Sequence, residues 1–318
     1  MKIMKKRFPV LAVAISMAMA SHVLAQTDAP TQKEKHMIEA YDTLNYIGLD
    51  KAKSETDSFK KKSKVIYDNY LLKKNIPYGL GVRETFDHFH NPKFSEADTQ
   101  GFFIFIHGGY WQGEVKDSYA FVGEKLLEQN IDLILIEYDL TKENTVDGKT
   151  IPRVGMTALV NEVGRALDAV QKYLQTNAAS EKPVYLAGHS AGGHLAAVWK
   201  DHPVVNKAVF PISGLFDLAP IAPTKKIGTA LQLNANEIIN LSPVNNIHTA
   251  NAASLPLYLY YGGNEQPELK EQSQHYSARL QDCHHKVSMK EIPGVNHFEI
   301  LNALFADPDS DLLRRIAK

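Results

Sequence analysis

A glycine-flanked serine is the residue best suited to nucleophilic chemistry. Ser190 is the centre of a G-x-S-x-G sequence, residues 188–192, between an apolar strand-like stretch and a helix-forming one. A tight strand–turn–helix of this kind raises the serine side chain at the edge of a sheet, and the flanking glycines remove side chains that would collide there. The amide of Ala191, at the start of the helix, can then stabilise developing negative charge. The alternative is a glycine-rich turn that only packs or binds phosphate.

A second glycine-rich sequence can supply the other half of an oxyanion hole. The sequence HGGYW, residues 107–111, closes an earlier apolar run. Paired glycines let backbone N–H groups face the space above Ser190, so the amides of Gly108 and Gly109 are the candidate donors. His107 is expected to orient this loop by hydrogen bonds rather than to react. The residues expected to line the substrate pocket are Tyr110, Trp111 and His189.

His297 is the predicted base for Ser190. A serine hydroxyl is a poor nucleophile at neutral pH and needs a base, and this arrangement runs along the chain as serine, acid, histidine. His297 lies in a turn after the strand-like residues 286–292, from which it can reach back over a sheet. The histidines that fit less well precede that strand or come too early in the chain: His284, His285, His88 and His90.

Two carboxylates compete to orient the imidazole. Glu265 ends a turn that follows the strand-like residues 257–261, and a glutamate can stabilise an imidazolium as an aspartate does. Asp217 follows the preceding strand and otherwise fits a turn or helix cap. Glu265 is favoured, with Asp217 as the alternative. The reaction that these residues predict is acyl transfer through an acyl-enzyme, for which no metal or organic cofactor is expected.

The elements that must position these residues alternate along the chain. From about residue 82 onward, short apolar runs closed by turn residues are separated by segments with helical periodicity. The runs cover residues 102–106, 133–138, 184–187 and 257–261, and the clearest helical segments cover 159–174 and 267–280. Runs that are apolar almost throughout indicate strands buried on both faces. The sequence therefore predicts an α/β fold, a doubly wound and mostly parallel sheet with helices on both faces.

The N-terminal residues have the composition of a targeting signal. A cationic start and an apolar run end in small residues at 23–25, so residues 1–25 are predicted to be a signal peptide cleaved before Gln26. An uncleaved anchor is the alternative, although the apolar run is short for a membrane span. We expect an exported protein, periplasmic or secreted, with a helical arm or partial cap at 26–75 and the catalytic domain at 76–318.

Composition restricts the partners. The 318 residues carry a formal net charge of −1 and give no basic footprint for nucleic acid. No apolar run after the signal is long enough to span a membrane. A single cysteine, Cys283, excludes an intramolecular disulfide. The expected partner is a small ester or amide substrate, and no oligomeric state is predicted.

With these residues assigned, the sequence resembles the kynurenine formamidase (arylformamidase)-like branch of the α/β-hydrolases. The likeness rests on five stretches in family order: HGGYW at 107–111, GHSAGGH at 188–194, SGLFDLAP at 213–220, GGNEQPELKEQS at 262–273 and NHFEIL at 296–301. The first two are shared by many esterases, and the last two are more specific. The resemblance implies an α/β-hydrolase fold.

The resemblance also assigns roles. It implies that Ser190, Glu265 and His297 match the family's catalytic triad, and that its oxyanion donors match Gly108, Gly109 and Ala191. Family members often carry aspartate where Glu265 stands. The family is associated with hydrolysis of N-formyl-L-kynurenine inside cells, whereas this chain is predicted to begin with an export signal. A general short-chain carboxylesterase is therefore an alternative, and a non-catalytic binding module on the same fold is another.

Overall fold

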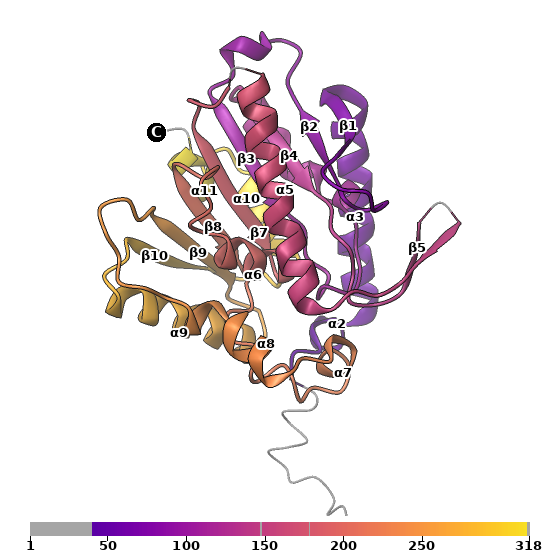
Figure 1. Ribbon diagram of the computed structural model, residues 1–318, viewed down its shortest axis with the longest axis vertical. Helices are drawn as coiled ribbons and strands as arrows, with labels where there is room; N and C mark the ends of the chain where they lie inside the picture. Colours follow the sequence, from indigo (N-terminus) through magenta and orange to yellow (C-terminus); the bar gives the residue numbers. More distant parts are fainter. Residues whose placement is uncertain (1–39, 147, 178, 317–318) are drawn as a thin grey trace, which may run out of the picture.

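The computed structural model of the protein describes residues 40–146, 148–177 and 179–316. The predicted signal peptide and the start of the predicted arm lie outside these residues. A sheet of eight strands runs through the molecule in the order β1-β2-β4-β3-β7-β8-β9-β10 (Figure 1). Its strands are β1 (Leu71–Pro77), β2 (Thr85–Phe89), β3 (Gly101–Ile106), β4 (Ile131–Ile136), β7 (Val184–His189), β8 (Ala208–Ile212), β9 (Leu257–Gly262) and β10 (Val287–Ile292).

Most neighbouring strands in this sheet are parallel. From β4 to β10 every adjacent pair is parallel, whereas β2 is antiparallel to both β1 and β4. Because parallel strands share one direction, their carboxyl ends lie along the same edge, where ligands bind in such sheets. A small hairpin, β5 (Asn144–Val146) and β6 (Lys149–Ile151), stands apart from the sheet (Figure 1).

Helices cover both faces of the sheet. Alternate side chains of each central strand point to opposite sides, so each strand contributes to a core on either face. Ile104 and Ile106 of β3 belong to the core under α5, α6 and α9, whereas Phe103 and Phe105 belong to the core under α3, α4, α10 and α11. The α-helices are α2 (Thr43–Ile47), α3 (Leu49–Tyr70), α4 (Glu124–Glu128), α5 (Met156–Thr176), α6 (Ala191–Val198), α7 (Gly228–Leu231), α8 (Ala235–Asn240), α9 (Pro267–Asp282), α10 (Glu299–Phe305) and α11 (Asp311–Ile316). Short 3-10 helices cover Glu96–Asp98, Lys116–Ser118, Ala120–Gly123 and Pro243–Asn245.

The predicted fold is confirmed. Each apolar run identified in the sequence overlaps a strand of the sheet, although the last two residues of the run at 133–138 lie beyond the end of β4, and the two helical segments lie in α5 and α9. The helix α5 shows why such patterns are legible, because its buried residues recur at three- and four-residue spacing. Among the described residues, no helix combines the length and the apolar character required to cross a bilayer.

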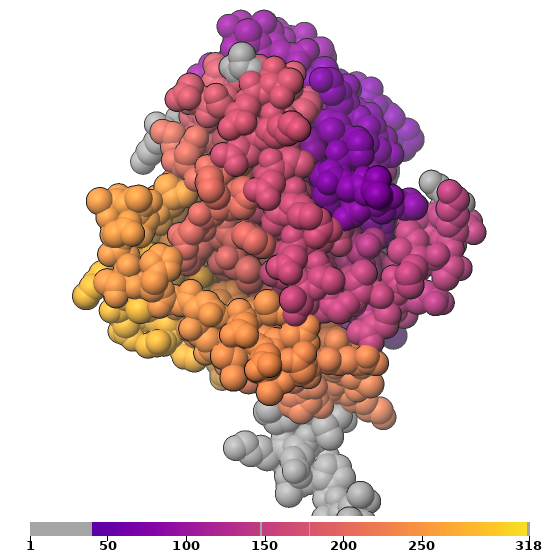
Figure 2. Space-filling view, in the orientation of Figure 1, coloured from indigo at the N-terminus to yellow at the C-terminus, as the bar shows by residue number. Residues whose placement is uncertain are grey.

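The beginning of the described chain packs closely against the rest. Phe59 and Ile66 of α3 are buried in one core, and β1 pairs with β2, so the predicted arm of residues 26–75 ends inside a strand. Figure 2 shows this early part, coloured indigo, against the magenta surface of α5. The contact includes Lys73 of β1, whose Nζ lies 5.1 Å from the centroid of the Tyr173 ring in α5.

Candidate active site

Ser190 occupies a strained turn between β7 and α6. Its backbone has φ 57° and ψ −119°, a combination that residues with a Cβ rarely adopt. The glycines on either side make the turn possible. A Cβ at Gly188 would lie 2.1 Å from the carbonyl oxygen of Gly192, and one at Gly192 would lie 2.0 Å from the carbonyl oxygen of Ile106 in β3. The G-x-S-x-G sequence is therefore required by the tight approach of α6 to two strands.

Glu265 and His297 form a buried pair. Nδ1 of His297 lies 3.2 Å from Oε2 of Glu265, in turns that follow β10 and β9. The other carboxylate oxygen accepts hydrogen bonds from the Ser213 hydroxyl at 2.5 Å and from the Gly262 amide at 2.7 Å. These bonds fix the orientation of Glu265, which in turn orients the imidazole. The sequence motif contained Ser213 but gave no signal of this role.

Asp217 takes a different part. Its carboxylate accepts a hydrogen bond from the Ala219 amide at 2.9 Å, as a residue capping its own turn does. Its backbone amide and carbonyl are bonded to Gln272. Of the two carboxylates that competed in the sequence, Glu265 is the one in contact with His297.

His189 connects the serine turn to the histidine turn. Its Nε2 lies 2.7 Å from the carbonyl oxygen of His297, and the centroids of the two rings are 4.6 Å apart. Burial, together with the neighbouring His297, holds the pKa of His189 well below its usual range. The ring is only 1% exposed, so its neutral imidazole packs inside the protein instead of forming an open pocket wall.

These contacts bring Ser190 and His297 to the same place without bonding them directly. Ser190 is the residue next to His189, whose ring packs on His297. No hydrogen bond links the Ser190 hydroxyl to any of the described residues. In enzymes without substrate, such hydrogen bonds are often long and tighten only when substrate binds.

The oxyanion loop, as we call residues 107–116 because the sequence predicts oxyanion donors in it, lies beside Ser190. A Cβ on Gly108 would lie 3.2 Å from the Cβ of Ser190. The carbonyl oxygen of Gly108 faces Nδ1 of His107 at 2.8 Å and accepts from the Tyr138 hydroxyl at 3.3 Å. In a trans peptide the next N–H points the opposite way, so the amide of Gly109 faces away from these two side chains.

The two glycines of this loop differ in their surroundings. Gly109 has φ 106° and a Cβ there would lie 2.2 Å from the Gly113 carbonyl oxygen, so only glycine fits. The Gly108 amide interacts with the hydroxyl of Tyr119. Burial raises the pKa of this hydroxyl far above its usual range. Ala191 begins α6, whose first turn has no side-chain cap. Of the three amides predicted as oxyanion donors, those of Gly109 and Ala191 thus have no such contact among the described residues.

The two aromatic residues of the loop differ, because Trp111 is buried whereas Tyr110 is half-buried and lines a cavity. Trp111 is fully buried, with its ring edge-on to His194 at 5.0 Å between centroids. The hydroxyl of Tyr110 donates to the carbonyl of Tyr41 at 2.7 Å and lies 2.7 Å from the Thr43 hydroxyl. A cavity of about 240 Å³ lies between this N-terminal segment, Gly109 and Tyr110. The segment at residues 41–43 therefore borders the site, a contact that the sequence did not reveal.

Metal ligands do not gather in the part of the chain described here. Within it, no cluster of three or more histidine, cysteine, aspartate or glutamate side chains has the arrangement of a metal site.

Known proteins resemble the chain in sequence and in structure. A family model described as BD-FAE matches residues 88–202. The kynurenine formamidase of Salmo salar is 28% identical over 255 residues, covering 77% of this chain and 80% of that protein. The kynurenine formamidase of Danio rerio is 26% identical over 286 residues, or 87% of each chain.

Solved structures give the same picture. A Silicibacter protein described as a candidate thioesterase superposes with a TM-score of 0.71 and 26% identity, over 89% of this chain and 99% of that one. An esterase of Pyrobaculum calidifontis superposes with a TM-score of 0.59 at 17% identity, over 83% of this chain and 89% of that one, and so supports the fold alone. The chain has the α/β-hydrolase fold, and its relatives indicate a hydrolase.

Proposed function

We propose that this hydrolase of the α/β-hydrolase fold cleaves a small ester or aryl-formamide through an acyl-enzyme on Ser190. The main support is the buried Glu265–His297 pair, which lies beside the strained serine turn at the edge where the parallel strands end. Nucleophile, acid and base then follow one another along the chain in the order typical of this fold.

The reaction has two halves. His297 takes the proton of the Ser190 hydroxyl, whose oxygen bonds to the substrate carbonyl carbon. The same proton passes to the leaving alcohol or amine as its bond to that carbon breaks. His297 then takes a proton from water, which attacks the acyl-enzyme and releases the carboxylic acid, and Ser190 recovers its proton. Glu265 holds the imidazole in place and stabilises it while it is charged.

Backbone amides hold the negative oxygen formed in each half. We assign Gly109 and Ala191 as the principal donors, because the carbonyl of Gly108 is tied down on the opposite side of its peptide. Gly108, also predicted as a donor, has its amide near the Tyr119 hydroxyl. Loss of one such donor typically lowers kcat by about 10²- to 10³-fold.

The substrate class comes from the relatives together with the site. Two relatives that cover most of the chain are named kynurenine formamidases, which favours an aryl-formamide. Esterases are frequent among the solved structures of similar fold, which favours a short-chain ester as the second candidate. We propose that Tyr41 and Thr43, bonded to Tyr110, form part of the pocket wall, as a partial cap would.

Replacing the nucleophile tests the mechanism. Ser190→Ala should abolish turnover of p-nitrophenyl acetate and of N-formyl-kynurenine, together with labelling by a fluorophosphonate probe. Ser273→Ala is the matched control, since this buried serine of α9 has a hydroxyl without a partner among the described residues. Retained turnover in Ser190→Ala contradicts the mechanism. A wild-type protein that neither reacts with the probe nor turns over either substrate supports the binding-module alternative.

Relative rates on the two substrates separate the candidates. A formamidase should favour N-formyl-kynurenine by its kcat/KM, and a carboxylesterase should favour the acetate ester.

We further propose that residues 1–25 direct export to the periplasm or beyond, although they lie outside the described residues. A mature N-terminus other than Gln26, measured by mass spectrometry of the native protein, would contradict this cleavage site.

A further inference from the structure

We propose that Glu137, paired with Arg83, is a positioning residue that holds the oxyanion loop in its working geometry through His107. This inference rests on the proposed function, since it concerns the same reaction. Glu137 directly follows β4, and Arg83 lies in the turn between β1 and β2. Neither residue contacts Ser190 or His297, so each would act through the loop.

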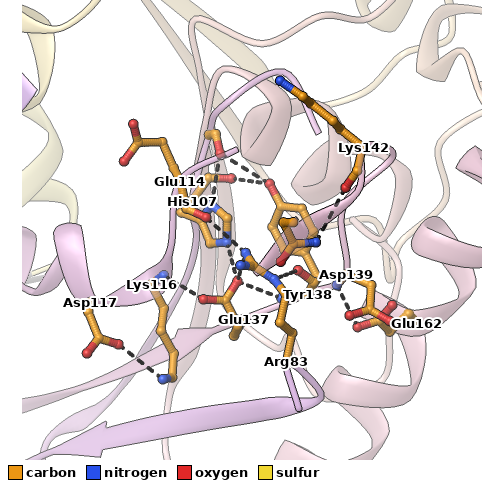
Figure 3. A network of polar contacts seen from close by, with 12 residues as sticks. Arg83, His107, Glu114, Lys116, Asp117, Glu137, Tyr138, Asp139, Lys142 and Glu162 are labelled. Atoms are coloured by element: carbon orange, nitrogen blue, oxygen red, sulfur yellow. Dashed lines mark hydrogen bonds and ion pairs between the residues drawn. The ribbon is translucent and has the colours of Figure 1, made fainter. Parts of the chain in front are cut away.

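Glu137 accepts hydrogen bonds from two parts of the loop. Its Oε1 lies 2.8 Å from Nε2 of His107, and its Oε2 accepts from the Lys116 amide at 3.0 Å (Figure 3). It also accepts from its neighbour, the Tyr138 amide, at 3.0 Å. One buried carboxylate thus joins the first residue of the loop to its last.

Arg83 completes the attachment. Its guanidinium bonds to Oε1 of Glu137 at 2.5 Å and to the carbonyl oxygens of Tyr138 at 2.7 Å and Glu114 at 2.9 Å. The two charged side chains are only 4% and 7% exposed. Burial alone would raise the pKa of Glu137, but His107 and Arg83 hold it below its usual range, so the carboxylate stays charged at neutral pH.

The position of His107 connects this cluster to the oxyanion donors. Its ring stacks on Tyr138 with centroids 4.2 Å apart, and its Nδ1 lies 2.8 Å from the Gly108 carbonyl oxygen. The Tyr138 hydroxyl donates to the carbonyl oxygens of His107 and Gly108. Because the peptide between Gly108 and Gly109 is planar, fixing its carbonyl also fixes the direction of the Gly109 amide.

Substituting Glu137 tests the inference. Glu137→Gln keeps the shape but removes the charge, and its new N–H group competes with the donors of His107 and Arg83. Since small misplacements of catalytic groups can cost on the order of 10²-fold in rate, we expect kcat to fall about 10- to 100-fold on p-nitrophenyl acetate. KM should change by less than about threefold, because the donors act mainly in the transition state.

A matched control comes from the other end of β4. Asp132→Asn also neutralises a buried carboxylate bonded to histidine, but its histidines lie away from the loop. It should leave kcat within about twofold of wild type. Arg83→Lys is the second test variant, since lysine keeps the charge without the planar fork that reaches three acceptors, and it should also lower kcat. Thermal unfolding of every variant shows which are folded at the assay temperature.

The outcomes separate this inference from the function itself. If folded Glu137→Gln or Arg83→Lys keeps the wild-type kcat, the positioning role is wrong. If Asp132→Asn loses as much kcat as Glu137→Gln, the loss reflects general weakening of the sheet, and the role is again wrong. Retained turnover in Ser190→Ala would instead overturn the proposed function.

Discussion

The two ends of β4 carry buried carboxylates that bond to histidine, yet they serve different surroundings. At its start, Asp132 lies 2.8 Å from both His88 and His90. Just after its end, Glu137 lies 2.8 Å from His107 and pairs with Arg83. The first cluster joins β2 to β4 and to Tyr173 of α5 through His88. The second holds the loop that carries the proposed oxyanion donors.

The comparison separates the chemistry of a cluster from its place in the fold. A carboxylate–histidine contact has the same hydrogen-bonding capacity at either end of a strand. Only the carboxyl end of a parallel strand lies at the edge where ligands bind. Charge is the second difference. Arg83 always carries its charge, whereas the groups that contact Asp132 are imidazoles, which as a class have a neutral form.

The largest effect on kcat is expected at a third carboxylate–histidine pair, Glu265 and His297. Its loss gives a reference against which the effects at the two ends of β4 can be compared. Glu265→Gln removes the charge that stabilises the imidazolium and should lower kcat about 10⁴-fold, as loss of the equivalent acid does in a known triad. Steady-state kinetics with p-nitrophenyl acetate measures this. Exposed Glu271→Gln, on α9, is the control and should be neutral. An effect on kcat smaller than that of Glu137→Gln would reverse the order proposed here.

Stability should distinguish the two ends of β4. Glu137→Ala leaves the Arg83 charge buried without its partner and should cost about 3–5 kcal/mol in the free energy of unfolding. Asp132→Ala removes one hydrogen-bond partner from each of two histidines but leaves no fixed charge such as that of Arg83, and should cost about 1–3 kcal/mol. Urea unfolding at pH 7 measures both.

A double substitution sharpens this comparison. Adding Arg83→Met to Glu137→Met should recover part of the stability lost in the single variant, because the remaining charge is removed. Equal losses in the two alanine variants, or no recovery in the double variant, would show that charge is not what separates the clusters.

Acid should reduce the contribution of Glu137, just after the end of β4, to the stability of the fold. The pKa of Glu137 is lower in the folded protein than in the unfolded chain, because His107 and Arg83 outweigh the effect of burial. Its contribution to stability is therefore present above the unfolded value, about 4.3, and is lost as pH falls through the folded value. The stability difference between wild type and Glu137→Gln should narrow as the pH falls below about 4. A difference that stays constant from pH 7 to pH 3 in urea titrations would contradict this.

The smallest effect is expected at His90, and in the opposite direction. Burial alone would lower the pKa of His90, but its hydrogen bond to Asp132 raises it. The stabilisation it provides is therefore present below the unfolded value, about 6.5, and is lost as pH rises through the folded value. Urea midpoints of wild type and His90→Gln should converge at high pH. Turnover should be the same in both.

Much of the fold could be predicted from the sequence because it depends on local patterns. Apolar runs of strand length and the helical spacing of α5 report burial directly, whatever the partner. The turn at Ser190 could be predicted for the same reason, since it needs glycine at fixed positions. His297 followed from its place after the last strand, where the fold brings it to the edge.

Contacts between residues far apart in the chain could not be predicted from the sequence. Glu137 stood in the sequence as an interruption of an apolar run, and its partner Arg83 is 54 residues away. His88 and His90 had no visible partner until β2 paired with β4 and brought Asp132 beside them. The choice between Glu265 and Asp217 also needed the structure, since both follow strands and only one touches His297.

The crowding around Gly192 has a consequence for how the protein becomes active. A Cβ at Gly192 would lie 2.0 Å from the carbonyl oxygen of Ile106 in β3, so the close packing of the serine turn depends on the pairing of β3 with β7. Glu265 and His297 lie 75 and 107 residues further along the chain than Ser190. A nascent chain that has β3 and β7 but not yet these two residues therefore contains the proposed nucleophile without its proposed acid and base, and we expect no ester hydrolysis from it.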